Sequence, residues 1–140
     1  MVEIIASDRH GLALVLPARG VDPEALGLPL MGIAPGQWLA FAADAPAGWA
    51  QDLAARLDPL ATVIDQSSAY VLFTLVGRDA RRLLQKGLSI DLDALAADAV
   101  TVSAIAGSGV IVHRDRLFVA RSHARAVRGW LDHARAAMAF

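Results

Sequence analysis

The sequence contains no cysteine, which excludes disulfide bonds, thiolate metal sites and cysteine nucleophiles together. No excess of one charge favours nucleic acid or an anionic membrane surface, because the formal net charge is −1. No apolar run approaches the roughly 20 residues of a membrane-spanning helix. Glu3 and Asp8 stand where a signal peptide would be basic, and the apolar run 12–16 is too short for its core. We therefore expect a cytoplasmic protein with neither nucleic acid nor membrane as a partner.

Aromatic residues are also scarce, yet the chain is more apolar than usual. Its hydrophobic fraction is 56% and its mean hydropathy +0.46, whereas about 45–50% apolar residues is typical. Alanine supplies much of this excess, so an alanine-rich composition alone could explain it. The alternative is that apolar surface is buried against another protein. The length of 140 residues suits a single domain, 1–140, built from two packed halves at about 1–60 and 61–140.

The periodicity of the apolar residues predicts an α+β fold with mixed or antiparallel sheets and helices packed on them. We expect helices near 46–58, 78–87 and 122–138. The runs 2–5 and 12–16 read as a hairpin, and 17–35 as an irregular Gly- and Pro-rich loop with one helical turn. Further strands are expected at 38–42, 62–65, 70–76, 100–106, 110–113 and 117–120, with Gly107-Ser108-Gly109 as a hairpin turn.

The segment 65–92 is the most informative part of the chain. An apolar strand ends at Gly77, an amphipathic helix follows, and Gly87 is expected to close it in the left-handed conformation. Asp79 lies in the first helical turn, where the helix dipole favours an anion. At 100° per residue, apolar and basic side chains separate onto opposite faces. The basic face consists of Arg78, Arg81, Arg82 and Lys86, together with Gln85.

No pattern indicates an active site or a metal site. Gly107-Ser108-Gly109 lacks the further residues of a phosphate-binding loop. His123 and His133 lie ten residues apart in one expected helix, about 15 Å along its axis, so they cannot share an ion unaided. His10 and His113 lie beside turns, where solvated histidines are common. The nearest carboxylate pair, at positions 91 and 93, falls in an expected loop. We thus predict no catalytic, cofactor-binding or metal-binding residue.

The basic face is the one concentrated polar feature, and two interpretations of it stay open. It is either a solvated helix exterior or a docking surface for an acidic patch on another protein, since Arg binds carboxylates through two parallel hydrogen bonds. The candidate interface residues are Arg78, Arg81, Arg82, Lys86 and Trp38. Trp38 joins them because tryptophan is enriched in interfaces, although it also fits a core position.

The order of three blocks resembles the gamma subunit family of heterotetrameric sarcosine oxidase. The first is residues 34–39 (APGQWL), a turn into a strand. The second runs from 63–67 (VIDQS) through 77–81 (GRDAR) to Lys86-Gly87 and 90–92 (IDL). The third, weaker block is 121–124 (RSHA) with Trp130-Leu131. Together the blocks cover roughly residues 33–138 in the family's order.

The resemblance implies an aminomethyltransferase-like folate-binding fold with ferredoxin-like halves and an accessory role. In that family the FAD, FMN, NAD and folate sites belong to the larger subunits, and zinc to another small one. It implies a non-catalytic subunit of a heteromeric flavoenzyme that oxidatively demethylates sarcosine or a similar N-methyl amine, with larger flavin-binding subunits as partners. Two alternatives remain open: a free-standing folate-binding or one-carbon-transfer protein, and a structural homo-oligomer.

Overall fold

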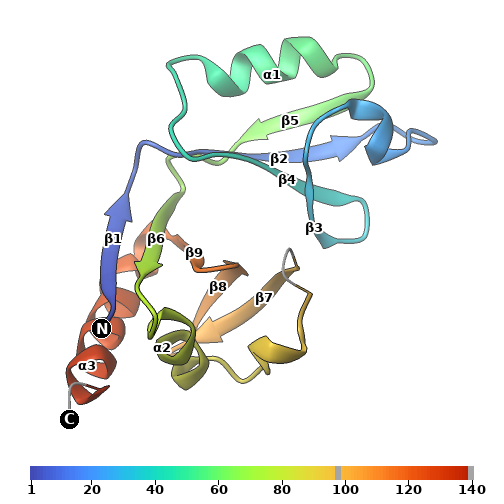
Figure 1. Ribbon diagram of the computed structural model, residues 1–140. Helices are drawn as coiled ribbons and strands as arrows, with labels where there is room; N and C mark the ends of the chain where they lie inside the picture. Colours follow the sequence, from blue (N-terminus) through green and yellow to red (C-terminus); the bar gives the residue numbers. More distant parts are fainter. Residues whose placement is uncertain (97–98, 139–140) are drawn as a thin grey trace. The chain divides into compact units, whose positions relative to one another are not determined.

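The computed structural model describes residues 1–96 and 99–138 and has the predicted α+β architecture of antiparallel sheets with helices packed on them (Figure 1). The chain divides into two compact units. The first consists of Met1–Ser7 and Ala69–Phe140, and the second of Asp8–Ser68. The sequence predicts a division near residue 60, whereas the first strand belongs with the C-terminal part. No helix within the described ranges has both the length and the apolar character needed to cross a bilayer.

The first unit contains a five-stranded antiparallel sheet in the order β1-β6-β9-β8-β7. Its strands are β1 (Glu3–Ser7), β6 (Tyr70–Val76), β7 (Val100–Ile105), β8 (Ser108–His113) and β9 (Arg116–Ala120). The strand that begins the chain pairs with β6, with Ile4 opposite Leu75. This pairing joins segments about 70 residues apart, which no local pattern specifies.

Two helices cover one face of this sheet. They are α2 (Ala80–Gly87) and α3 (Ala124–Met138), and the short 3-10 turns η2 (Leu92–Ala94) and η3 (Arg121–His123) adjoin them. Strand side chains alternate between the two faces, so Phe73 and Leu75 of β6 point toward the helices. They share one apolar core with Leu83 of α2 and Leu131 of α3.

The second unit contains a four-stranded antiparallel sheet in the order β3-β4-β2-β5. Its strands are β2 (Gly11–Pro17), β3 (Met31–Ala34), β4 (Gln37–Ala42) and β5 (Ala61–Asp65). The helix α1 (Trp49–Leu57) packs on one face through Leu53 and Leu57, and η1 (Pro23–Leu26) closes the core with Leu26.

Two local predictions are wrong. The runs that begin the chain do not form a hairpin, because β1 pairs with β6 while β2 pairs with β4 and β5 in the other sheet. The Gly- and Pro-rich stretch also hides a strand, β3, which turns into β4 at Pro35-Gly36, where Gly36 has φ +72°. Each error has its own physical cause. The hairpin was wrong because pairing partners depend on tertiary contacts. Strand β3 was missed because a strand of only four residues, one of them glycine, has a weak local signal.

Gly87 is the last residue of α2, but a glycine is needed there for a reason other than the expected one. It does not adopt a left-handed conformation, and the helix is capped by Leu88. A Cβ atom on Gly87 would lie 2.7 Å from the ring of Trp130 on α3. The glycine therefore lets the Trp130 ring approach the α2 backbone. Gly129, inside α3, has nothing within 4 Å of its Cβ position.

We expect Gly87→Ala to destabilise the protein and Gly129→Ala to stabilise it. Alanine in a helix gains roughly 1 kcal/mol over glycine in both cases. At Gly87 the clash with Trp130 outweighs that gain, giving a net loss of about 1–3 kcal/mol. Urea denaturation followed by circular dichroism measures both changes. Equal effects of the same sign at the two positions would contradict the close packing of Trp130 on Gly87.

Candidate partner-binding surface

The turn between β6 and α2 determines where the basic side chains begin. Gly77 has φ +124°, a conformation that side-chain-bearing residues rarely adopt, and α2 starts three residues later. Asp79 precedes the helix but makes no capping hydrogen bond. Its carboxylate instead accepts a hydrogen bond from the amino group of Met1, which lowers the pKa of Asp79, and the charges of Arg78 and Arg82 lower it further.

The two faces of α2 separate as the sequence predicts. Ala80, Leu83 and Leu84 are buried in the core of the first unit, with exposed fractions of 2% or less. The polar side chains point the other way and line a groove of about 540 Å³. Its lining residues are Arg78, Arg81, Arg82, Gln85, Lys86 and Asp93.

Two of these polar side chains form hydrogen bonds with the loop that follows α2. The Arg81 guanidinium donates a hydrogen bond from Nε to the Asp93 carboxylate, at 2.9 Å, and another to the Leu92 carbonyl. Gln85 accepts from the Leu92 amide at 2.8 Å and donates to the carbonyl of Ile90. Arg81 was predicted as an interface residue, but these contacts give it a structural role in fastening η2 to α2. Sequence periodicity cannot reveal this, because it does not indicate which loop a helix face meets.

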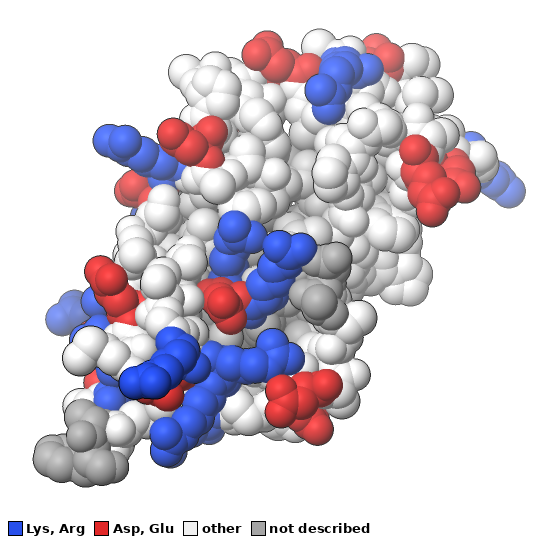
Figure 2. Space-filling view, in the orientation of Figure 1, with Lys and Arg blue, Asp and Glu red and all other residues white. Residues whose placement is uncertain are grey.

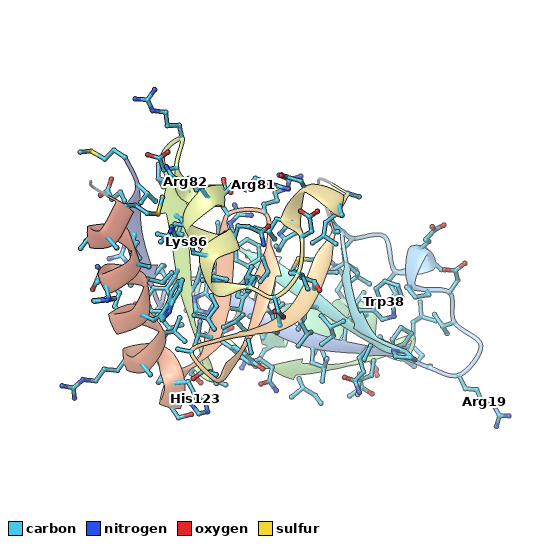
Figure 3. All side chains as sticks on the ribbon, turned by 90° about the horizontal axis from the view of Figure 1, so that it is seen from below. Arg19, Trp38, Arg81, Arg82, Lys86 and His123 are labelled. Atoms are coloured by element: carbon cyan, nitrogen blue, oxygen red, sulfur yellow. The ribbon has the colours of Figure 1, made fainter. Side chains whose placement is uncertain are left out.

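The remaining cations form what we call the basic row: Arg78, Arg82 and Lys86. They are four residues apart, so they follow one side of the helix and the turn before it. All three are exposed, and none forms a salt bridge within the described ranges. Figure 2 shows Lys and Arg side chains gathered over α2, and Figure 3 shows Arg82 and Lys86 on this helix. The row is therefore available to an external anion.

Charge is divided unevenly between the two units. The first carries ten of the chain's thirteen Lys and Arg residues and seven of its fourteen Asp and Glu residues. The second carries only three Lys and Arg against seven acidic residues. The net charge of −1 thus conceals a basic unit and an acidic one. An anionic surface is attracted to the first unit even though the whole chain is slightly acidic.

Trp38 lies on β4 of the second unit, whereas the basic row belongs to the first (Figure 3). It is half-buried against the apolar core of that unit and stands opposite Gly32 on β3. A Cβ atom on Gly32 would lie 2.9 Å from the Trp38 ring, so the ring covers this glycine. Trp38 therefore fills space within its own unit.

The sequence did not predict a polar hollow of about 460 Å³ that lies in the second unit. Its lining includes Asp8, His10, Asp44, Asp65 and Ser67. The Ser67 hydroxyl accepts from the Leu12 amide at 3.0 Å and donates to the Leu12 carbonyl at 3.3 Å, and Asp65 accepts from the Ser67 amide at 2.9 Å. These groups anchor the turn after β5 on β2. The Ser67 hydroxyl is therefore engaged in hydrogen bonds with the backbone of Leu12.

The expectation that His10 is solvated is wrong. Its side chain is only 2% exposed, since it directly precedes β2 and does not lie in a hairpin turn. The neighbouring Gly11 admits the Trp49 ring, which would be 2.6 Å from a Cβ atom there. Within residues 1–96 and 99–138, no group of three or more His, Asp or Glu side chains is arranged to hold a metal ion.

Comparison with solved structures finds the same fold in a chain of a known enzyme. A chain of the heterotetrameric sarcosine oxidase from Corynebacterium sp. U-96, solved in complex with pyrrole 2-carboxylate, superposes with a TM-score of 0.80. The match covers 95% of this chain and 83% of that one, at 18% sequence identity. The resemblance to a sarcosine oxidase subunit is thus confirmed at the level of the fold. No family model matches the sequence, and no curated protein does.

Proposed function

We propose that the chain is a non-catalytic accessory subunit of a heteromeric flavoenzyme of the sarcosine oxidase type. Its substrate would be sarcosine or a similar N-methyl amine. The observation that carries the proposal is the likeness to a chain of the heterotetrameric enzyme over most of both chains. Because both chains are covered almost throughout, they are of comparable length, as expected for two small subunits of the same kind.

The local chemistry supports an accessory role. In the polar hollow of the second unit, Ser67 and Asp65 make backbone hydrogen bonds. On α2, Arg81 and Gln85 hold the η2 turn. These four polar side chains therefore stabilise the fold through their hydrogen bonds. In this proposal the FAD, FMN, NAD and folate sites lie on partner subunits.

The basic row is the surface through which we propose that the chain docks. Arg82 and Lys86 present their cations on α2, and Arg78 presents its own on the turn before it. Arg pairs with carboxylates through two hydrogen bonds. The complementary partner is an acidic patch on a larger subunit. A specific interface of ordinary size buries about 1,600 Å² in total, which exceeds this row alone. In this proposal the row orients the chain on its partner and raises the rate of association. Apolar contacts around the row make up the rest of the interface.

Co-expression with any large flavin-binding oxidase subunits that neighbouring genes encode tests the proposal. We expect the chain to co-purify in stoichiometric amount with a flavin-containing complex, whereas the chain alone purifies colourless. Omitting the chain should lower the solubility of the larger subunits more than the activity of those that stay soluble. A chain that binds no oxidase subunit but binds folate by itself would replace this function with a free-standing folate-binding one.

A further inference from the structure

The edge strand β7 lacks the features that normally protect a sheet edge. Natural edge strands carry charges, prolines or bulges, because an open row of backbone donors and acceptors pairs readily with another strand. Three of the four sheet edges here follow this rule. β1 carries Glu3, β5 ends in Asp65, and β3 has a register shift between Gly32 and Ala34.

β7 differs from the other three edges. Its sequence, VTVSAI, has no charge and no proline, and it pairs with β8 in continuous register from Val100 to Ile105. It ends the five-stranded sheet, so its outer side meets no strand of the described chain. Val102 in its centre is 58% exposed. The strand is thus uncharged, regular in register and not paired with any described strand along one side.

The register with β8 determines which backbone groups point outward. The hairpin turn consists of Ala106 and Gly107, both with positive φ, and Ile105 stands opposite Ser108. In a two-residue hairpin this closing pair is hydrogen-bonded, and such pairs alternate along the strands. Val100, Val102 and Ala104 therefore direct their N–H and C=O groups to the open edge. Their side chains all lie on the sheet face away from Ile105 and the helices.

This arrangement is complementary to itself. If two copies pair antiparallel with Val102 opposite Val102, then Val100 of each copy faces Ala104 of the other. All three outward-pointing residues would exchange both of their backbone hydrogen bonds. Apolar side chains would meet on one face, while Thr101 and Ser103 would meet on the other. A two-fold axis through Val102 would generate this closed, symmetric contact.

We infer that β7 is a self-association site at which a second copy of this chain adds its own β7, joining two five-stranded sheets. The occupant is a second copy because the pairing is symmetric and brings no like charges together. The basic row, in contrast, would repel its own copy. A strand pair alone is smaller than a standard interface, so we expect weak association, with a dissociation constant of roughly 10–100 µM. This inference is independent of the proposed oxidase partners.

The absence of native cysteine makes the register directly testable. In the proposed pairing the two Val102 Cα atoms lie about 5.5 Å apart, within the roughly 4.4–6.8 Å range of disulfides. We expect Val102→Cys to form a cross-linked dimer under mild oxidation. Ala104→Cys alone should not, but a mixture of Val100→Cys and Ala104→Cys chains should form the hetero-cross-link. Ile64→Cys, at an exposed site on β5, measures random collision.

Sedimentation of the full-length chain completes the test. We expect its average mass to rise with concentration across the 10–100 µM range. Val102→Pro should abolish the rise while leaving the fold intact, because the lost N–H points away from β8. Ile64→Lys should behave as the unmodified chain does. The inference fails if Val102→Cys cross-links no faster than Ile64→Cys, or if the chain stays monomeric throughout that range.

Discussion

Reversing two charges of the basic row, with Arg82→Glu and Lys86→Glu together, is expected to weaken binding to the proposed oxidase partner subunits about a hundredfold at low salt. Each substitution removes an attraction and places a carboxylate against an acidic surface, and together they cost about 3 kcal/mol. Both side chains are exposed and form no salt bridge within the described ranges, so the fold should not suffer. Binding is measured by interferometry with the purified flavoprotein.

The matched control is the pair Arg19→Glu and Arg56→Glu, which changes the net charge by the same amount. Both arginines are exposed and belong to the second unit, whereas α2 belongs to the first. We expect this pair to change the dissociation constant less than threefold, within ordinary surface effects. The difference between the two variants should shrink at about 0.5 M salt, where screening is strong. Equal losses from both pairs would show that net charge matters and the basic row does not.

Leu83→Ala is expected to lower the free energy of unfolding by about 3–4 kcal/mol. Leu83 is 0% exposed and lies where α2 meets the sheet and α3 in the core of the first unit. Truncation leaves a cavity that close-packed neighbours fill only in part. A domain of this size has roughly 5–15 kcal/mol of stability, so the loss is a large part of the total. Urea unfolding monitored by circular dichroism measures it.

Leu60→Ala is the control for this substitution. Leu60 is 45% exposed in the connection between α1 and β5, so its truncation removes little buried area. We expect a change below about 1 kcal/mol. Since Leu83 anchors the helix that carries the basic row, Leu83→Ala should also weaken partner binding as the temperature rises. A loss at Leu83 no larger than that at Leu60 would contradict the placement of α2 in the core.

Most of the elements followed from local patterns, and the exceptions have identifiable causes. The stripe of Leu83 and Leu84 predicted α2, and the run 70–76 predicted β6 at its observed bounds. The pairing of β1 with β6 could not be predicted, because a strand's own residues do not indicate its partner. Strand β3 was missed because glycine and proline around it mask a pattern of only four residues.

The exposure of the candidate surface residues could be predicted from the sequence, but their contacts could not. Helical periodicity correctly put Arg78, Arg82 and Lys86 opposite the buried side of α2. It also included Arg81, whose guanidinium proves to be bound to Asp93 and the Leu92 carbonyl. Whether an exposed helix face contacts solvent or a loop depends on the path of the chain after the helix. A helical wheel does not show that path.

The sequence by itself determined the α+β class, the three helices, the basic face of α2 and the resemblance to a sarcosine oxidase subunit. These features depend on side-chain periodicity and on residue order, both of which are local. Only the tertiary structure decided that the first strand joins the C-terminal unit, that Gly87 makes room for Trp130, and that β7 ends its sheet unprotected. Each of these depends on contacts between residues distant in the chain, and such contacts form only when the whole core packs.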